Sequence, residues 1–342
     1  MRPPCDVLLA YERAGHCTLR NLLPAANVES LVPAIDAAYA AQQLQVHKQK
    51  LRVLLGEEVL EQAEKQARDE RTLLAVLRKH MAALPAGSAP FLQGFNLWRA
   101  SADIAALACS PAIAGTAAAL LGAPRVRLYQ DALFVKRPGD GPTHWHSDLA
   151  MAPLDTNSFV TCWLPLQTVP AEIDGGSALV FANGSHRDVA LHYWHGDPST
   201  AADCSGRGYS ESVAERLEVG DSTWHHGWAL HCAGANQRRQ PRRALALSFF
   251  ADGATRLGRE ARRAVHTEDA ESYDAWIDEV KPGRAARHRL LPLVWSDGRA
   301  QRIELPTPTA AASAPARAQR ATRRPRAPGG ASKGALGKAR TR

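Results

Sequence analysis

Three His-x-Asp pairs in this sequence could each supply two ligands to one metal ion. Iron(II) sites commonly use two histidines and one carboxylate on one face of the metal, which leaves positions open for a chelating co-substrate and oxygen. A β-strand suits such a pair, because residues i and i+2 point to the same side of a sheet. The pairs are His146/Asp148, His186/Asp188 and His195/Asp197. The motif by itself does not choose among them.

Position in the chain favours the first pair. It follows an alternating stretch, 126–136, and the turn RPGDGPT, and Asp148 lies 83 positions before His231. That distance leaves room for the middle strands of a barrel before a third ligand returns. The other two pairs lie in turn-like segments, NGSHRD and HGDPS, and too few strands follow them for such a return. We therefore expect His146 and Asp148 to bind the metal, with His144 as a weaker alternative of the same strand parity.

The segment TWHHGWALHC offers the third ligand. Period-two geometry places His225 and His231 on one face of a strand and His226 on the other. Arg242 lies eleven residues after His231 and opens the next predicted strand, which we expect to pair with the ligand strand. Arginine makes the bidentate contact that the far carboxylate of a dicarboxylic co-substrate needs. His225 stays the alternative third ligand, and Arg243 is the alternative to Arg242, although its side chain should point to the opposite face of the strand.

Short β-like runs separated by Gly, Pro, Asn and Asp fill the middle of the chain. We predict strands at 126–136, 159–168, 178–182, 216–219, 223–232 and 244–251. Many short strands without intervening helices indicate an antiparallel sandwich or barrel.

Helical periodicity marks the regions on either side of these strands. We predict helices at 28–46, 57–84 and 102–121 from apolar residues at three- and four-residue spacings, and a return to helix at 269–280. The chain is therefore expected to form one domain, 1–305, made of a mainly helical region 1–124, a β core 125–251 and a helical or irregular region 252–305.

The positive charge of the chain is concentrated at its end. The formal net charge is +8, but residues 306–342 carry nine basic side chains and no acidic one, so the rest is close to neutral. This Ala-, Pro- and Arg-rich tail has almost no large apolar residue, and we predict that it is disordered. It could bind nucleic acid or act as a nuclear address. A solvated tail without a partner is at least as plausible, and the tail lacks the aromatic residues that stack on single strands.

Composition also limits the cellular context. No run approaches the roughly 20 apolar residues of a transmembrane helix, and the start of the chain lacks the apolar stretch of a secretory signal. The six cysteines form no CxxC pair, which argues against a zinc ribbon or a disulfide framework. A cytoplasmic protein is expected, or a nuclear one if the organism is eukaryotic.

Four segments together resemble the phytanoyl-CoA dioxygenase (PhyH) family. They are LYQDALFVKRPGDGPTHWHSDL, TCWLPL, GGSALVFANGSH and GDSTWHHGWALHCAGANQRRQPRRALALSFF, which cover roughly residues 125–251. The resemblance implies a double-stranded β-helix (jelly-roll, cupin-like) core flanked by helices. It implies iron(II) ligands at His146, Asp148 and His231 and a 2-oxoglutarate contact at Arg242. Two further residues, Lys136 and Trp163, are expected to line the 2-oxoglutarate pocket.

The resemblance also implies an activity. A member of this family would use iron(II), 2-oxoglutarate and O₂ to hydroxylate a small organic substrate, releasing succinate and CO₂. Asp148 points to a hydroxylase, because halogenating relatives have a small residue at that position. Two alternatives stay open: a catalytically silent β-helix protein with a binding or regulatory role, and an oxygenase that reaches a nucleic acid or a protein through the basic tail.

Overall fold

A computed structural model describes most of the chain outside its C-terminal tail. The described residues are 3–83, 91–188, 209–213, 215–258 and 276–306, and they all belong to one unit, Met1–Pro306. The predicted tail and residues 269–275 of the last predicted helix lie outside the described residues. Only a turn of helix at 276–279 is seen there.

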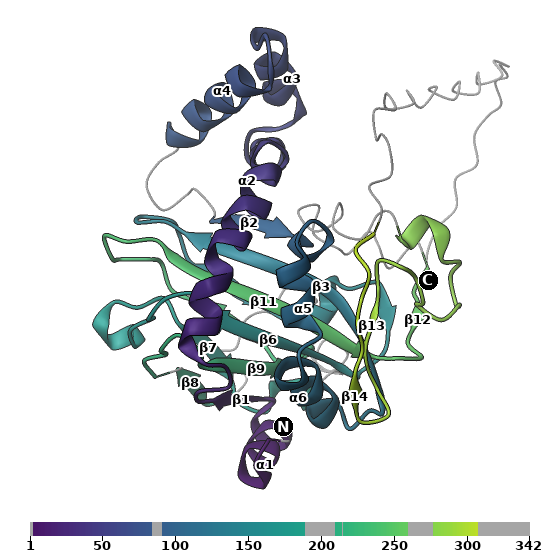
Figure 1. The fold of residues 1–342 in the computed structure, drawn as a ribbon. Coiled ribbons are helices and arrows are strands. Elements are labelled where there is room, and N and C mark those ends of the chain that lie inside the picture. Colours follow the sequence, from purple (N-terminus) through teal and green to yellow (C-terminus); the bar gives the residue numbers. More distant parts are fainter. Residues whose placement is uncertain (1–2, 84–90, 189–208, 214, 259–275, 307–342) are drawn as a thin grey trace, which may run out of the picture. The chain divides into compact units, whose positions relative to one another are not determined.

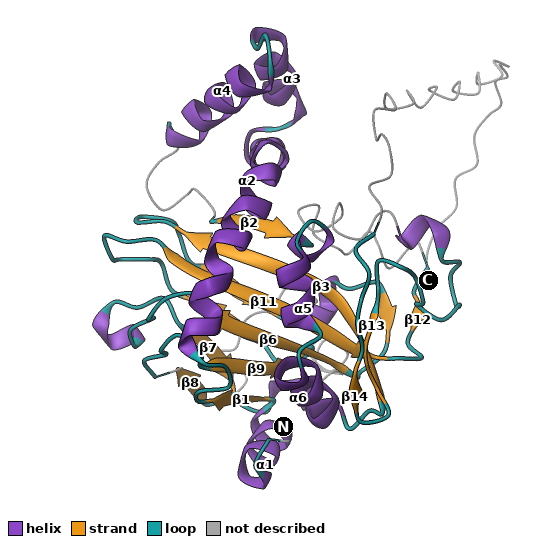
Figure 2. Cartoon of the chain, in the orientation of Figure 1, coloured by secondary structure: helices purple, strands orange, loops and turns teal. Residues whose placement is uncertain are grey.

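Two antiparallel sheets form the core (Figure 2). The large sheet has the order β1-β9-β6-β11-β3-β13-β14, with β2 also pairing β3, and the small sheet has the order β4-β10-β7-β8. The large sheet comprises β1 His16–Leu19, β2 Leu92–Phe95, β3 Arg125–Lys136, β6 Phe159–Pro165, β9 Ser222–His226, β11 Arg242–Ala251, β13 Leu293–Ser296 and β14 Arg299–Ala300. The small sheet comprises β4 Thr143–His146, β7 Leu179–Ala182, β8 Glu211–Val213 and β10 His231–Ala233, while β5 Leu154–Asp155 and β12 Thr255–Arg256 form a separate pair. This is the predicted double-stranded β-helix, and the fold prediction is confirmed.

The two faces of the large sheet have different partners. Along β11, Leu245, Leu247 and Phe249 belong to the apolar cluster beneath the helices. The intervening residues Ala246 and Ser248 line a cavity on the other face. The side chains alternate because successive residues of a strand point to opposite sides. The inner face of the sheet is therefore available for a site.

Three helices, α2 Ala25–Leu55, α5 Ala102–Ala108 and α6 Pro111–Leu121, cover the outer face. Helix α1 Cys5–Ala14 packs on β1, and α3 Glu57–Gln66 and α4 Glu70–Ala82 pack on α2 and on each other. Short 3₁₀ turns are η1 Leu97–Arg99, η2 Asp148–Met151, η3 Glu172–Asp174 and η4 Ser185–Arg187. Figure 1 shows α2, α5 and α6 lying across the large sheet. Buried Ile35, Ile104 and Ile113 join these helices to the apolar cluster of the sheet.

Two predicted helices are each divided in two. The predicted helix 57–84 is α3 and α4, because Asp69 caps α4 by accepting a hydrogen bond from the Thr72 amide at 2.7 Å. The predicted helix 102–121 is α5 and α6, because Ser110 caps a new helix that has Pro111 in its first turn. The predictions located the helical regions but missed these internal caps.

The segment 102–121 also corrects the expectation about apolar runs. An 18-residue window of this 20-residue segment has a mean hydropathy of 1.9, so by length and composition the segment could cross a membrane. In the structure, 61% of this apolar window is buried inside the protein. Its composition fits a pair of helices packed on a sheet.

The strand predictions need corrections as well. The segment 216–219 is not a strand: it contributes only single bridges, Leu217 to Val169 and Val219 to Asp221. The segment 223–232 is two strands, β9 and β10, which belong to different sheets. The edge strands β1 and β2 were not predicted.

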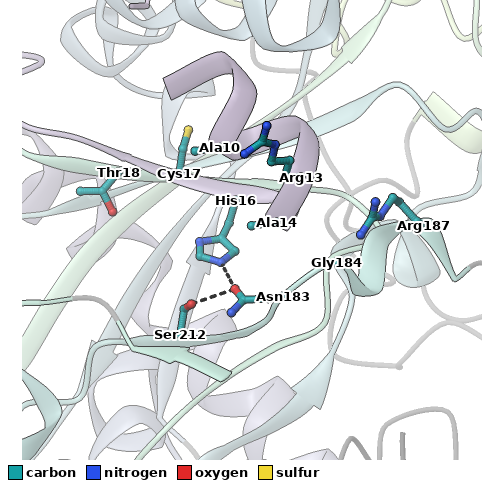
Figure 3. A pocket seen from close by; sticks show the side chains of 10 residues that line it. All are labelled: Ala10, Arg13, Ala14, His16, Cys17, Thr18, Asn183, Gly184, Arg187 and Ser212. Atoms are coloured by element: carbon teal, nitrogen blue, oxygen red, sulfur yellow. Dashed lines mark hydrogen bonds between the residues drawn. The ribbon is translucent and has the colours of Figure 1, made fainter. Parts of the chain in front are cut away.

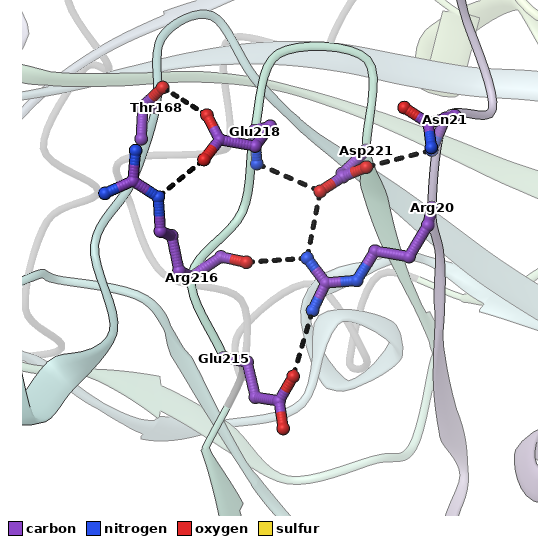
Figure 4. Close-up of polar contacts among 7 residues, drawn as sticks. All are labelled: Arg20, Asn21, Thr168, Glu215, Arg216, Glu218 and Asp221. Atoms are coloured by element: carbon purple, nitrogen blue, oxygen red, sulfur yellow. Dashed lines mark hydrogen bonds and ion pairs between the residues drawn. The ribbon is translucent and has the colours of Figure 1, made fainter.

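A polar network holds β1 against the turn before β9 (Figure 4). Arg20 donates to Asp221 at 2.9 Å and to the Arg216 carbonyl at 2.6 Å. The Asn21 amide donates to the other oxygen of Asp221 at 2.9 Å. These contacts fix the start of β9, the strand that carries His225.

A second carboxylate, Asp252, anchors the opposite end of the large sheet. Its side chain is 1% exposed and receives Arg127 Nε at 2.6 Å, Arg125 Nε at 3.0 Å and Arg287 Nη2 at 3.0 Å. Burial alone would raise the pKa of Asp252, but the three arginines outweigh it and lower the pKa to about 2. Asp252 therefore links the end of β11 to the start of β3 and to the C-terminal segment.

Replacing Asp252 with asparagine should lower the free energy of unfolding by about 2 kcal/mol at neutral pH, since two of the three arginines are partly exposed. The wild-type contribution should be present above about pH 4 and lost as the pH falls through about 2, because the folded pKa is depressed. Urea unfolding across this pH range measures both effects. Asp155→Asn, at an exposed site on β5, is the control. Equal losses in the two variants would contradict the assignment.

Candidate metal centre

Three predicted ligands meet where the small sheet faces the large one. Candidate ligand atoms of His146, Asp148 and His231 all lie within 4.8 Å of one another. His146 ends β4 and pairs with His231 of β10, and Asp148 opens η2 directly after β4. His146 Nε2 lies 3.8 Å from Asp148 Oδ1, and His231 Nε2 lies 3.6 Å from the same oxygen. Two nitrogens and one oxygen thus converge on one point.

The backbone orients both imidazoles. His146 Nδ1 contacts the His144 carbonyl at 2.8 Å, and His231 Nδ1 contacts the Ala229 carbonyl at 3.1 Å. A carbonyl oxygen only accepts, so each Nδ1 carries the hydrogen and each Nε2 presents its lone pair to the cluster. Burial, with the charges of His146 and His225, lowers the pKa of His231 well below its ordinary value. The ring is therefore neutral at physiological pH, as metal ligation requires.

The second oxygen of Asp148 is bound to the large sheet. Thr161 on β6 donates to Oδ2 at 2.5 Å, and His225 Nε2 on β9 donates to it at 3.0 Å. The single hydroxyl hydrogen of Thr161 is used in this bond, so Ser248 on β11 must donate to Thr161 at 3.0 Å. Three strands of the large sheet thus orient one carboxylate.

Charge and hydrogen bonds keep Asp148 ionised. Burial alone would raise its pKa. At the low pH where this carboxyl titrates, the charge of protonated His231, the hydrogen bond and charge of His225 and the charge of His146 outweigh this effect, and the pKa lies well below its ordinary value. Oδ1 is thus an anionic ligand atom at any physiological pH.

His225 and His231 join one cluster without sharing a strand. Their rings are 4.3 Å apart, although β9 and β10 lie in different sheets. The period-two argument therefore placed them together for the wrong reason, since a turn at 227–230 lies between the two strands. His226 faces away, toward His186 and Tyr11.

Arg242 lies at the other end of the cavity wall. It is buried on β11, which pairs β3 and β6, so the expectation that its strand pairs the ligand strand β10 is wrong. Its guanidinium lies 5.4 Å from the Trp163 ring, and Nη2 donates to Ser177 at 3.4 Å. Its Nε is buried without a hydrogen-bond partner among the described residues. Burial lowers the pKa of Arg242 to about 10, so it stays cationic at neutral pH.

Two neighbours of Arg242 make contacts with other protein groups. Lys136 pairs with Arg242 across β3 and β11, but its ammonium donates to the Gly234 carbonyl at 2.8 Å and to Thr143 at 3.2 Å. Burial and the like charge of Arg242 lower the pKa of Lys136 to about 7. Arg243 forms an ion pair with Asp36 on α2, on the other side of the sheet. Among the three, Arg242 alone lines the cavity.

One cavity of about 530 Å³ joins these groups. The three candidate ligands, Arg242 and Trp163 all line it. The rest of its wall is largely apolar and aromatic and includes Phe91, Phe95, Tyr129, Phe134, Trp145 and Phe159. This volume suits a small molecule together with a small co-substrate.

The family model for phytanoyl-CoA dioxygenase (PhyH) matches residues 11–244. The chain belongs to the PhyH family. No curated protein matches the sequence significantly.

Solved structures share the fold of this PhyH-family chain. The non-haem α-ketoglutarate-dependent carbocyclase SnoK from nogalamycin biosynthesis matches with a TM-score of 0.61 and 20% identity over 85% of this chain and 96% of that one. The epimerase SnoN in complex with Fe³⁺, α-ketoglutarate and nogalamycin RO matches with a TM-score of 0.56 and 22% identity over 84% of this chain and 97% of that one. At this level of identity the likeness concerns the fold.

The pair His186/Asp188 does not add to the centre. His186 contacts the Glu12 carbonyl at 3.2 Å, and Asp188 accepts a hydrogen bond from Tyr209. The pair His195/Asp197 lies outside the described residues. In the described part of the chain, His146, Asp148 and His231 are the one group of three ligating residues that could hold a metal.

The Phe181 ring packs against His225 and His231. Its ring lies 5.6 Å from His225 and 6.1 Å from His231, and on its other side His16 stacks against it at 4.2 Å. His16 donates to Asn183 at 2.7 Å, and Ser212 donates to the same oxygen at 2.8 Å (Figure 3). Burial lowers the pKa of His16, so this ring is a neutral packing element. His16 and Asn183 line the pocket of Figure 3, and Phe181 lies next to both His16 and His231 of the candidate metal centre.

The supporting residues Thr161, Ser248 and Ser177 were missed at the sequence level. Strand parity could have indicated two of them, since Thr161 shares the face of Trp163 on β6 and Ser248 shares the face of Arg242 on β11. Ser177 lies in a loop and offers no such signal.

His225→Leu should weaken divalent metal binding by about 10- to 100-fold, because Asp148 would lose one of the two groups that orient it. Calorimetric titration with Co²⁺ measures the effect. His226→Leu is the matched control, since the neighbouring ring faces His186 instead of Asp148. Unchanged Co²⁺ affinity in His225→Leu would contradict the positioning role.

Proposed function

We propose that this chain is an iron(II)- and 2-oxoglutarate-dependent dioxygenase that hydroxylates a small organic substrate. The observation that supports this most strongly is the pairing of two features in one cavity. One is the convergence of His146, Asp148 and His231, with both Nε2 atoms presented to a common point. The other is the buried cation of Arg242 in the same wall.

The donor set fits iron(II). Two neutral imidazoles and one carboxylate on one side of an ion form the facial triad of non-haem iron oxygenases and leave the remaining positions open. Each ligand has a further hydrogen-bond partner, which is the usual arrangement around a bound metal. His146, Asp148 and His231 would therefore hold the iron.

The opposite end of the cavity fits a carboxylate. An Arg242 Nε without a partner is unusual in a buried guanidinium, because an unsatisfied buried donor is unfavourable. A dicarboxylate bound at the metal by one end would supply that partner at the other, in the bidentate geometry that arginine favours. Trp163 beside the guanidinium would fix its plane.

Protein groups mainly position and protect the reactants. Iron bound here would supply the oxygen chemistry, in which 2-oxoglutarate and O₂ become succinate and CO₂ as one oxygen atom enters a substrate C–H bond. The hydrogen bond from Thr161 fixes the orientation of the Asp148 carboxylate, and His231 stays a neutral imidazole. The aromatic wall excludes water from the reacting atoms.

A small substrate is favoured over a macromolecule. The cavity of about 530 Å³ has to hold both the co-substrate and the substrate, and its wall is mostly apolar. The Arg242 Nε also argues against a silent binding protein, which has no need for an unsatisfied buried cation. We propose hydroxylation as the outcome, because the intact Asp148 leaves no halide position.

Anaerobic addition of Fe²⁺ and 2-oxoglutarate should produce the weak visible charge-transfer band of the iron chelate. His231→Ala should abolish this band, since two ligands cannot hold the ion in the same geometry. The absence of the band in wild type, or its survival in His231→Ala, would contradict the proposed function.

Arg242→Met should raise the dissociation constant for 2-oxoglutarate about 10- to 100-fold, as expected for loss of charged hydrogen bonds to a carboxylate. Titration of the same band with 2-oxoglutarate measures it. Arg243→Met is the matched control, because Arg243 pairs with Asp36 outside the cavity. Similar affinities in both variants would show that the far carboxylate binds elsewhere.

A further inference from the structure

The edge strand β2 contributes a side-chain amide to the cavity wall. Along this strand Leu92 joins the apolar cluster beneath the helices, and a side chain at Gly94 would collide with Tyr39 of α2. Gln93 and Phe95 therefore point to the opposite, inner face, where both line the cavity. Gln93 is half-buried, and no group in the described part of the chain forms a hydrogen bond with its amide.

Aromatic rings surround this amide. Phe91 and Phe95 are each two positions away along the chain, and Phe134 is the direct partner of Gln93 across β2 and β3. Such neighbours lie about 5 to 7 Å apart, so all three rings can contact a group bound to Gln93. Ala132 pairs with Phe95, and its small side chain leaves room above the sheet. This part of the wall is therefore an apolar recess that contains one amide.

Several other polar groups of the wall are already engaged. Thr161 contacts Ser248 at 3.0 Å, and Lys50 and Gln130 both have partners within the chain. The amide of Gln93 differs from these groups, because its N–H donors and its carbonyl oxygen are open to a ligand.

A substrate that covers this amide has to supply its hydrogen bonds. Water can do so before the substrate binds, but an apolar group in place of that water would leave a donor and an acceptor unsatisfied. A carboxamide presents an N–H and a C=O side by side, and an amide or lactam matches both with two parallel hydrogen bonds. A carboxylate accepts but cannot donate, so it would leave the Gln93 carbonyl unpaired.

The recess lies far from the candidate metal site. Thr161, which orients Asp148, belongs to β6, and β11 and β3 lie between β6 and β2. Three strand spacings correspond to about 14 Å of sheet. A group bound at Gln93 is therefore remote from the carbon that reacts at the metal.

We propose that Gln93 binds an amide or lactam of the primary substrate, at the end remote from the oxidised carbon, and that this end is a flat ring system packed among Phe91, Phe95 and Phe134. This inference deepens the proposed function, because it takes the same cavity to be the substrate site. Gln93 then determines which substrates are accepted without contacting the metal.

The test compares 2-quinolone, a flat bicyclic lactam, with N-methyl-2-quinolone, which lacks the N–H donor. Dissociation constants are measured by ligand-observed NMR on the protein loaded with Zn²⁺ and saturated with 2-oxoglutarate, so that the metal site and Arg242 are occupied. Wild type should bind 2-quinolone about tenfold more tightly than its N-methyl derivative, or more, because the derivative leaves the Gln93 carbonyl unpaired.

Gln93→Leu should abolish this preference, since leucine has a similar volume and no polar atom. Gln301→Leu is the matched control. It makes the same substitution at a side chain that donates to the Arg299 carbonyl and does not line the cavity. The preference should survive in this variant. The wild-type comparison of the two quinolones does not depend on any variant being folded.

Equal binding of the two quinolones to wild type, no detectable binding of 2-quinolone, or a preference that persists in Gln93→Leu would each overturn the proposal. Binding of 2-oxoglutarate, followed separately by its charge-transfer band with Fe²⁺, distinguishes the two claims. A normal band without a lactam preference rejects the role of Gln93 alone. A missing band rejects the proposed function.

Discussion

The Asp148 carboxylate joins the two sheets of this barrel. One oxygen receives Thr161 from β6 and His225 from β9, both in the large sheet. The other oxygen faces His146 and His231 of the small sheet at 3.8 and 3.6 Å. A buried carboxylate needs such partners, because an unpaired one is strongly disfavoured in a low-dielectric interior. The geometry of the candidate metal site therefore depends on both sheets keeping their positions.

Tight packing around the turn between β9 and β10 keeps the two sheets in these positions. A side chain at Gly227 would meet Leu149 and Phe159 at 2.9 Å, so only glycine allows η2 and β6 to approach so closely. The Leu149 amide donates to the Gly227 carbonyl at 2.9 Å, which ties the residue after Asp148 to the turn that leads to His231. This contact thus holds Asp148, which follows β4, close to the turn that leads to His231 on β10. At the other end of the cavity, Arg242 belongs to the same inner face, through the long pairing of β11 with β3.

The sequence predicted the features that depend on short-range periodicity. Alternation identified β3 and β11, and the spacing of His146, Asp148, His231 and Arg242 led to residues that the structure places around one cavity. Features set by tertiary contacts were not predictable. The division of β9 from β10 depends on packing at Gly227, and the direction of the Lys136 ammonium depends on the carbonyl of Gly234 in a distant loop. Edge strands of four residues, such as β1, carry too little pattern to be recognised.

The central claim is that one ion is shared by His146, Asp148 and His231. Anomalous diffraction from crystals soaked with Mn²⁺ tests it most directly. The account predicts a single strong peak bonded to Nε2 of both histidines and to Oδ1 of Asp148, with His225 still hydrogen-bonded to Oδ2. A peak at another site, or one ligated by His225 in place of His231, would contradict it.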